Sequence, residues 1–552
     1  MRTDRRGFLG ILAGAVGVLA LPGRAQNVPS ANALEIHRIT RNTRAGAIGR
    51  WLTSWGSVQP PAKEYAGSAR VALPAVVAGS SRSLAATVRG FAPAAGFEAR
   101  EIPLATLARL LHQTNGITGE LVVKSGRVPL RAAPSAGALY AGEVYVAAER
   151  VRGLAPGLYH FAVLERALVR LREGPTLSEV ADTLEEPDRV RGAAFAVLHS
   201  NVFARYGERY GNRGYRYALI DTGHIAENLR LAAAAEGFGE VGCTRFEDER
   251  LDALLGADGR AEAVCFVSAV GVPAEVARSG ARGALHLVEI DPRAAVAPGR
   301  SVHRYHQATR LVRGEDGRGP VEAARSADPG GSAAQVPPAD ITGDRLPSRA
   351  ADPSVGVEVA IRARRSPLVF VPEAIDAVDL AFVLAMARGD APLERAPGVE
   401  LFAIVHRVRG VAPGLYASDG HRLALRRAGD LRAALTEACL GQDKAGLVAA
   451  ALLMVARPAE AAARSGPRAY RDLLVESGAI GQRIYLAAES VGLAARNLAA
   501  FWDDELDELL GFGPDGCAVL HMTLLGRDGS DVAAGRAQED AIAGRRGTSG
   551  QS

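Results

Sequence analysis

Apolar residues along the chain follow two periods, one typical of helices and one typical of strands. Between Ile102 and His112, leucines stand at positions 104, 107, 110 and 111, which is the spacing of one helix face. From Ile220 to Ala234 the chain is rich in alanine and almost wholly apolar, which predicts a long helix packed closely in the centre or at an interface. Short apolar runs at 144–147 and 263–270 predict strands. Helices flanking an antiparallel type of sheet predict an α+β layer fold.

The same series of elements occurs twice along the chain. The segment Arg150 to Tyr159 (RVRGLAPGLY) returns as Arg407 to Tyr416 (RVRGVAPGLY), and residues 215–239 parallel residues 470–494. The second copy repeats the predicted helices at 380–386 and 479–489 and the strands at 401–405 and 518–525, and each copy has an acidic helix, at 246–255 and 501–510. Such a series predicts two tandem units of one fold.

Weaker matches extend the repeat upstream, where His37-x-x-Thr40 is answered by His306-x-x-Thr309. The two units are therefore predicted to span residues 34–300 and 303–527, each a mostly antiparallel sheet flanked by helices. The Gly- and Pro-rich stretch 315–353 is expected to form an extended surface arm of the second unit. Residues 528–552 are small, polar and charged, which predicts a disordered tail.

The N-terminus has the pattern of an export signal. Arg5 and Arg6 precede Gly-Phe-Leu and an uncharged stretch that runs to Leu21, and small residues follow near Ala25. The apolar stretch is shorter than the roughly 20 residues that span a bilayer, so a stable membrane anchor is not expected. Paired arginines before Phe-Leu predict a twin-arginine signal at 1–25 and a periplasmic protein, and a Sec signal with a chance arginine pair is the alternative.

Composition excludes some classes of function. The 552 residues carry a formal net charge of +4, which is too small to produce the field expected of a nucleic-acid-binding protein. The four cysteines show no C-x-x-C spacing, and His303 and His306 have no further ligands nearby, so no metal site is expected. The length exceeds what a single hydrophobic core usually fills, in keeping with two units.

Three motifs of the first copy resemble a known family. The stretch 134–140 (PSAGALY), the stretch 213–217 (RGYRY) and the motif Asp221-x-Gly-His224 are similar to the SagB/thiazoline oxidase branch of the flavin nitroreductase superfamily. The resemblance covers nearly all of the chain after residue 25 and is strongest from about 130 to 270. It implies FMN bound at an interface between two units, which here means a pseudodimer within one chain that is monomeric in solution.

The resemblance also implies which residues hold the flavin. In the superfamily one unit binds the phosphate with an Arg-x-Ser-x-Arg stretch, and the other lays a Pro-Ser loop against the ring. Here the second copy has Arg364, Arg365 and Ser366, with Leu368 in place of the second basic residue. The first copy has the loop residues Pro134, Ser135, Ala136, Gly137 and Ala138, and Ala499 and Ala500 of the second copy complete the predicted cofactor site.

Each copy lacks the motif that the other retains. The first copy has no Arg or Ser at 91–96, and the second copy lacks the Pro-Ser loop between 393 and 400. One complete FMN site per chain is therefore predicted. The alternative is that RARRS is a solvated helix end and PSAGA an ordinary turn.

Arg209 and Tyr210 are the predicted catalytic pair, because they stand where azoline-oxidising relatives carry Lys-Tyr. Arginine is a poor base since it stays protonated, but its charge is expected to lower the pKa of Tyr210 and make the phenol the base. The second copy has Arg464 and Ser465 at this position. A surface tyrosine in an Arg-rich loop is the alternative.

These residues predict an exported FMN-dependent dehydrogenase or oxidase that removes a hydride from a C–N or similar bond of a small molecule or modified peptide. Oxidation is favoured because NAD(P)H is not a periplasmic hydride donor. Two alternatives stay open: an FMN-dependent nitro or quinone reductase, and a flavin-free binding or maturation partner that has kept only the fold.

Overall fold

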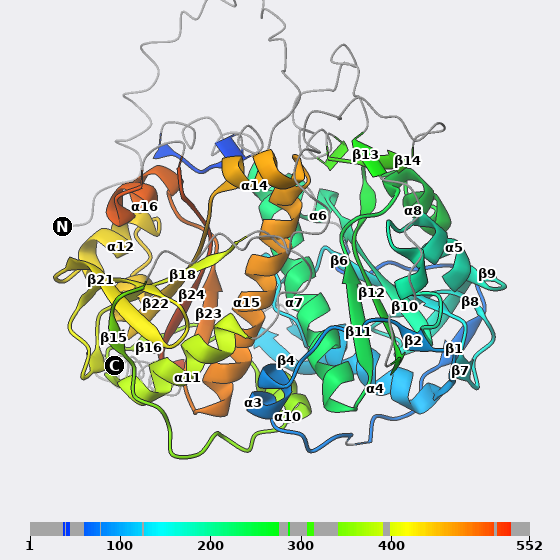
Figure 1. Ribbon diagram of the computed structural model, residues 1–552, viewed down its shortest axis with the longest axis horizontal. Coiled ribbons are helices and arrows are strands. Elements are labelled where there is room, and N and C mark those ends of the chain that lie inside the picture. The colour runs from blue at the N-terminus through cyan, green and yellow to red at the C-terminus, as the bar shows by residue number, and fades with distance from the viewer. Residues whose placement is uncertain are drawn as a thin grey trace, which may run out of the picture.

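The computed structural model describes residues 37–44 without 39, 60–274 without 78, 124 and 125, 285–287, 306–313 without 308, 341–389, 398–512 and 516–530. We call the body formed by residues 60–274 unit 1 and the body formed by residues 341–530 unit 2. The two units lie on either side of a central pair of long helices (Figure 1). Predicted segments 1–25, most of the arm 315–353 and most of the tail 528–552 lie outside the described residues.

Each unit contains one eight-stranded sheet, and the two sheets have the same order of strands. In unit 1 the order is β1 (Arg70–Ala72), β9 (Ala167–Glu173), β8 (Gly157–Ala162), β6 (Gly142–Ala148), β10 (Phe195–Val202), β12 (Glu262–Pro273) and β11 (Gly239–Cys243), with β2 (Phe97–Glu98) also on β12. In unit 2 it is β15 (Asp344–Arg345), β21 (Arg422–Ala428), β20 (Gly414–Ser418), β18 (Glu400–Val405), β22 (Ala450–Ala456), β24 (Ala518–Asp528) and β16 (Phe370–Val371), with β23 (Ala494–Leu498) also on β24. All these pairs are antiparallel, which confirms the predicted sheet type.

Four smaller pairings complete the strands of the described residues. Two are short parallel pairs at equivalent places, β3 (Ile102–Pro103) with β7 (Val151–Arg152) and β17 (Ile375–Asp376) with β19 (Val408–Arg409). The hairpin of β4 (Ile117–Val123) and β5 (Gly126–Arg131) belongs to unit 1, and β13 (Leu285–Leu287) pairs with β14 (Leu311–Arg313).

The helices repeat in the same way. Unit 1 has α3 (Leu84–Arg89), α4 (Leu104–Asn115), α5 (Thr176–Thr183), α6 (Ala204–Tyr210), α7 (Gly214–Ala235) and α8 (Asp248–Leu255), with the short 3-10 turns η1 (Ala136–Ala138), η2 (Pro187–Arg189) and η3 (Gly211–Arg213). Unit 2 has α10 (Val357–Ala363), α11 (Ala377–Arg388), α12 (Arg432–Ala438), α13 (Lys444–Leu447), α14 (Pro458–Ser465), α15 (Ala469–Ser490) and α16 (Asp503–Leu510). None of the described helices combines the length and the apolar character needed to cross a bilayer.

The predicted alanine-rich helices are α7 and α15, and they cross each other at two equivalent glycines. A Cβ at Gly223 would lie 2.8 Å from the backbone nitrogen of Ala479, and a Cβ at Gly478 would lie 2.8 Å from the backbone carbon of Ile220. Both glycines are the tenth residue of their helix. The missing side chains let the two backbones approach closely, so the interface between the units is built on the repeat itself.

Two buried ion-pair clusters join the units across this interface. Arg213 and Arg216 of unit 1 bind Asp503 of unit 2 at 2.5 and 2.6 Å, and Arg468 and Arg471 of unit 2 bind Asp248 of unit 1 at 2.6 and 2.9 Å. All six side chains are at most 2% exposed. Burial raises the pKa of Asp503, but Arg213 and Arg216 outweigh it and hold that pKa at about 2. Each cluster is a latch that pairs the start of a central helix of one unit with the acidic helix of the other.

The segments before the two units are exchanged between them. The backbone N–H of Asn42, which precedes unit 1, donates to Asp503 of unit 2 at 2.8 Å. The backbone N–H of Leu311, which precedes unit 2, donates to Asp248 of unit 1 at 2.8 Å. Each lead-in thus packs on the acidic helix of the unit that it does not precede in the chain. It also accepts hydrogen bonds from its own unit, Thr40 from Arg216 and Thr309 from Arg468.

Candidate functional site

The predicted ring-facing loop, residues 134–138, joins β5 to β6 and has a strained backbone. Gly137 has φ of +62°, and Ala138 and Tyr140 have φ of 54° and 49°. Glycine adopts this conformation freely, whereas residues with a Cβ pay on the order of 1 kcal/mol or more for it. Gly137 and Ala138 are exposed, so the loop offers small residues and backbone groups at its surface.

Side chains of unit 1 hold the loop in this shape. The Ser135 Oγ accepts a hydrogen bond from the backbone N–H of Tyr140 at 2.8 Å and lies 2.7 Å from the Tyr206 hydroxyl. Tyr206 in turn donates to the buried carboxylate of Asp221 on α7. The loop is therefore tied to α6 and α7, and its geometry is set by the buried part of unit 1.

The predicted phosphate-binding residues follow α10 of unit 2 and lie against unit 1. The Arg364 guanidinium donates from Nε to the carbonyl of Ala132 and from Nη2 to the carbonyl of Arg131, both at 3.1 Å. These carbonyls lie two and three residues before Pro134. The structure thus brings the two predicted flavin motifs together across the interface of the units, as the complementary losses in the sequence suggested.

Arg364 is a buried cation with no carboxylate bound to it in the described part of the chain. It is 4% exposed, its guanidinium carbon lies 5.2 Å from the ring centre of Tyr485, and burial lowers its pKa. Arg365 is exposed and donates to the carbonyl of Thr118 at 3.0 Å. The Ser366 hydroxyl lies 2.7 Å from the Tyr485 hydroxyl. An anion placed here would relieve the buried charge of Arg364.

Three further residues at this place were missed as site residues. Arg496 donates to the carbonyl of Pro367 at 2.8 Å, which adds a third cation beside Ser366. The backbone N–H of Asn497 donates to the Tyr485 hydroxyl at 2.9 Å, and the Asn497 side-chain nitrogen lies 2.7 Å from Nε2 of His224. The motif Asp221-x-Gly-His224 was the available signal for His224. For Arg496 and Asn497 the only signal in the sequence was that two polar residues interrupt an apolar stretch before Leu498.

His224 connects the two units as a neutral imidazole. Burial lowers its pKa to about 3, so the ring is uncharged at neutral pH. Its Nδ1 bonds to the carbonyl of Gly478, which can only accept, so Nδ1 carries the proton and Nε2 accepts from Asn497. The Thr523 hydroxyl donates to the Asn497 side-chain oxygen at 2.6 Å. His224 of unit 1 thereby fixes β23 of unit 2.

The predicted catalytic pair ends α6, and Tyr210 lies directly against the loop. A Cβ on Gly137 would collide with the Tyr210 hydroxyl, so glycine at 137 makes room for it. The Tyr210 ring packs edge-on against Tyr217 at 4.9 Å, and the Tyr217 hydroxyl donates to the carbonyl of Ala499 at 3.1 Å. Tyr210, the loop and Ala499 of unit 2 therefore meet at one place.

The expected effect of Arg209 on Tyr210 is corrected by the structure. Burial raises the pKa of Tyr210, and the nearby Tyr217 raises it further; Arg209 lowers it by less, although its guanidinium carbon lies 5.9 Å from the ring centre. The pKa of Tyr210 therefore lies above its usual value, because desolvation of the phenolate outweighs one exposed cation. Tyr210 is a protonated hydrogen-bond donor at neutral pH, and a base only if another group assists it.

Ala500 takes no part in the contacts between the units that involve Ala499. The Ala500 carbonyl accepts from Gln442 of its own unit at 3.1 Å, whereas the Ala499 carbonyl accepts from Arg213 of unit 1 at 2.9 Å. Ala499 lies at the interface, and Ala500 is held within unit 2.

The equivalent place at the other end of the interface is built differently. Phe91 is the eighth residue counted from the start of α3, as Arg364 is from the start of α10, and Arg230 on α7 is equivalent to Tyr485 on α15. The Arg230 guanidinium lies 4.5 Å from the Phe91 ring centre and forms an ion pair with Glu227 at 2.7 Å. At this end the ring therefore follows the short helix and the cation stands on the long central helix, the reverse of Arg364 and Tyr485. The cation already forms an ion pair.

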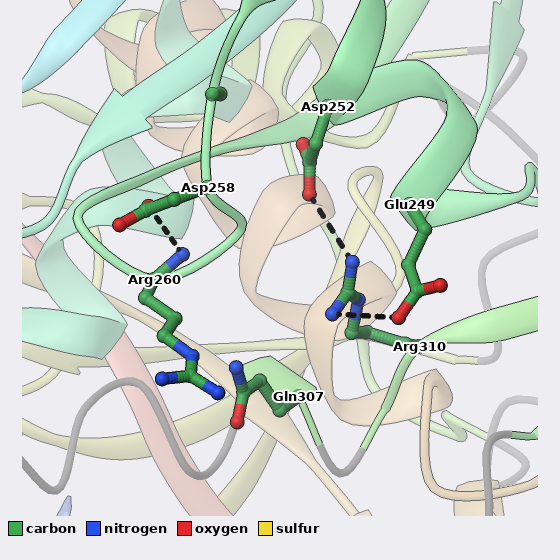
Figure 2. Close-up of a pocket in the computed structure, with 7 residues that line it drawn as sticks. Glu249, Asp252, Asp258, Arg260, Gln307 and Arg310 are labelled. Atoms are coloured by element: carbon green, nitrogen blue, oxygen red, sulfur yellow. Dashed lines mark hydrogen bonds and ion pairs between the residues drawn. The ribbon is translucent and has the colours of Figure 1, made fainter.

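Two pockets in the described surface contain none of the predicted flavin residues. One, of about 450 Å³, lies at the second lead-in, where Arg310 contacts Glu249 at 3.3 Å and Asp252 at 3.8 Å (Figure 2). The equivalent pair in the other half is Arg41 with Asp507 at 2.9 Å, so this arrangement belongs to the exchanged lead-ins. The other pocket, of about 1150 Å³, lies beside Trp502 and Arg432 of unit 2.

Comparison with known proteins agrees with the repeat. The model of the nitroreductase family matches the chain twice, at residues 96–272 and 361–527. A nitroreductase-family protein of Methanocaldococcus jannaschii is 29% identical over 154 residues, which is 28% of this chain and 74% of that protein. The crystal structure of a nitroreductase-family protein of Anabaena variabilis superposes with a TM-score of 0.71 at 24% identity, covering 90% of this chain and 99% of that one. The latter protein shares the fold of both units.

Proposed function

The chain belongs to the nitroreductase family, and from this premise we propose that it is an FMN-dependent oxidoreductase with one flavin per chain, at the interface of its two units. The observation that carries the proposal is the contact of Arg364 in unit 2 with the carbonyls of Arg131 and Ala132 in unit 1. It joins the two halves of a flavin site that neither unit contains alone.

The residues present suit the two ends of FMN. The phosphate would be held by Arg364, Arg365 and Ser366, and the buried charge of Arg364, which forms no ion pair in the described part of the chain, favours an anion there. The flat ring would lie against residues 134–138, whose small side chains and positive φ angles expose backbone groups. The opposite end of the interface has Phe91 in place of the arginine, which supports one flavin rather than two.

Bound FMN supplies hydride transfer, and the chain's own residues position the substrate and its proton. Tyr210 holds a proton at its hydroxyl beside Gly137, because burial keeps its pKa high. Tyr206 and Tyr217 enclose one side of Tyr210 with their rings and exclude water from it. Arg209, exposed next to Tyr210, adds positive charge on the open side.

For the direction of the reaction, we propose oxidation of a C–N or similar bond in a small molecule or modified peptide, in the manner of the SagB/thiazoline oxidase branch. The support is the set of motifs 134–140, 213–217 and Asp221-x-Gly-His224. Export by a twin-arginine signal at 1–25 into the periplasm is part of the proposal, and it removes NAD(P)H as a donor. A nitro or quinone reductase is the second candidate, because a protonated Tyr210 suits delivery of a proton to a reduced substrate.

The test is the visible spectrum and flavin content of the purified chain after folding with FMN. One FMN per chain is expected. Absence of a flavin band would overturn both enzyme functions and favour the flavin-free binding partner, and two FMN per chain would overturn the single site. With flavin bound, candidate amines or azolines are then added under anaerobic conditions. Loss of the flavin absorbance band means that they reduce the flavin, which supports the oxidase over the reductase.

A further inference from the structure

Asp221 lies on α7 behind the loop 134–138 and is linked to it through Tyr206. The carboxylate is 5% exposed and accepts a hydrogen bond from the Tyr206 hydroxyl. The Ser135 hydroxyl lies 2.7 Å from the Tyr206 hydroxyl, and because Tyr206 gives its proton to Asp221, Ser135 is the donor in that contact. One buried carboxylate thus orients a chain of hydroxyls that ends on the loop.

The loop depends on such support because its backbone is unfavourable by itself. Gly137, Ala138 and Tyr140 have positive φ angles, and two of the four non-glycine residues with positive φ in the described part of the chain lie here. The bond from Tyr140 N–H to Ser135 Oγ closes the turn on the same serine that bonds to Tyr206, the partner of Asp221. The conformation that exposes the loop is therefore fixed from the side of Asp221.

The equivalent carboxylate of unit 2 has a different partner. Glu476 is the eighth residue of α15, as Asp221 is of α7, and Glu476 forms an ion pair with Arg483 at 3.2 Å. For Asp221, the groups that lower its pKa are Tyr206, Ser135 and the backbone of Ala136, and no cation of the described residues is among them. Burial dominates and raises the pKa of Asp221 to about 7.

The ionisable groups around Asp221 are phenols. Tyr206 and Tyr210 face it from α6 and Tyr140 faces it from the loop, and burial keeps the pKa of each above its usual value. Arg364, from the segment after α10, acts on Tyr140. These tyrosines stay protonated through the neutral range, so Asp221 is the member of this group whose charge changes there.

We propose that Asp221 is a positioning residue that fixes the flavin-facing loop from behind, so that FMN binding weakens when this carboxylate takes up a proton. The inference rests on the proposed FMN site. The physical reason is that the carboxylate accepts the Tyr206 proton and so leaves the Tyr206 oxygen to accept from Ser135, whereas a protonated carboxyl must itself donate and can accept fewer bonds. Loss of one such bond to a charged group loosens the loop.

The experiment measures the Kd of FMN by fluorescence titration of the full chain at pH 6.0 and pH 8.5. Asp221→Asn is expected to bind about tenfold more weakly than the wild type at pH 8.5, which is about 1.4 kcal/mol, and equally at pH 6.0. Glu476→Gln is the matched control at the equivalent position and is expected to keep the wild-type Kd at both values. Protonation of the FMN phosphate also changes with pH, but it affects the Kd of all variants alike. It therefore cancels in the ratio of the variant Kd to the wild-type Kd.

The outcomes separate the inference from the proposed function. A wild-type Kd in Asp221→Asn at pH 8.5, or an unchanged ratio of the two Kd values between the pH values, would overturn the role of Asp221 while leaving the FMN site intact. Lack of FMN binding by the wild type would overturn the site and with it the inference. If Asp221→Asn does not fold, Tyr206→Phe removes one donor and keeps the ring; weaker binding at pH 8.5 supports the inference and unchanged binding overturns it.

Discussion

The two ends of the interface between the units use equivalent positions in opposite ways. Near the proposed flavin, the cation Arg364 stands on the loop after α10 and the ring of Tyr485 on the central helix. At the other end, the ring of Phe91 stands on the loop after α3 and the cation Arg230 on the central helix. The ring–cation contact occurs at both ends, but of these two cations only Arg230 forms an ion pair in the described part of the chain. The packing contact is thus shared, whereas the proposed binding function belongs to one end.

The residues next to these two ring–cation pairs also differ in charge between the two ends of the interface. Gln482 donates to Asn228 at 2.7 Å near the proposed site, whereas the equivalent pair at the other end is Arg483 with Glu227 at 3.3 Å. Burial also raises the pKa of Glu240, at the latter end, to about 8. At the end without a flavin motif, Arg230 and Arg483 both form ion pairs with Glu227. At the end with the motif, Arg364 forms no ion pair in the described part of the chain, which suits the proposed ligand.

The latches, in contrast, are alike in both halves. Asp503 and Asp248 occupy the first position of their helices and each binds two buried arginines of the other unit. The contacts that hold the two units together are therefore symmetric, whereas the proposed binding site at their interface is asymmetric. Four sets of variants probe this contrast.

The largest effect is expected from removing the latches. Asp503→Ala and Asp248→Ala each leave two buried arginines without a partner, which should lower the free energy of unfolding by about 3–5 kcal/mol. Guanidinium unfolding of the full chain measures both. If one variant costs less than about 1 kcal/mol while the other costs the full amount, the latches are not equivalent.

Arg364 and Arg230 are expected to differ in ligand binding. Arg364→Met should weaken FMN binding about 100-fold, because charge-assisted hydrogen bonds to a phosphate contribute about 1.5–3 kcal/mol each. Arg230→Met is the matched control and should leave the Kd of FMN unchanged, since that cation is paired with Glu227. Fluorescence titration measures both, and equal losses in the two variants would contradict the single site.

The glycines at the helix crossing should again act alike. Gly223→Ala and Gly478→Ala each place a Cβ against backbone atoms of the other central helix, which cannot move aside as a side chain can. Each is expected to lower the free energy of unfolding by about 1–3 kcal/mol. The comparison uses Gly492→Ala as a reference, where nothing lies within 4 Å and only the positive φ is strained. An effect at the crossing no larger than that of Gly492→Ala would contradict close helix contact.

The smallest effect concerns the pH dependence of stability. Burial raises the pKa of Asp252 and Asp507, the fifth residues of α8 and α16, from 3.8 to about 7. The folded chain then binds more protons than the unfolded chain between about pH 4 and pH 7, so both residues make stability fall as pH rises through this range. Asp252→Asn and Asp507→Asn should each remove on the order of 1 kcal/mol of the fall between pH 5 and pH 8. Unfolding at several pH values measures this, and an unchanged slope in either variant would refute the assignment.

Much of the fold could be predicted from the sequence, because the same hydrophobic pattern occurs twice in the chain. The helix predicted at 102–112 is α4, its partner at 380–386 lies in α11, and the predicted strands 144–147 and 401–405 lie in β6 and β18. Hydrophobic period is a local property, and the same pattern in two copies specifies the same elements twice. The complementary motifs at 134–138 and 364–366 were also readable, since each is continuous in the chain.

What the tertiary structure decided depends on neighbours that are remote in sequence. The packing of the lead-ins, the stacking of Arg230 on Phe91 and the link from His224 to Asn497 join residues more than 60 positions apart. The pKa of Tyr210 is the clearest case. Its neighbour Arg209 was visible in the sequence and predicted a lower pKa, but the burial that raises it is a property of the folded interface. The sequence alone determined two like units with complementary motifs, and packing determined which charges are left for a ligand, because desolvation depends on everything that surrounds a group.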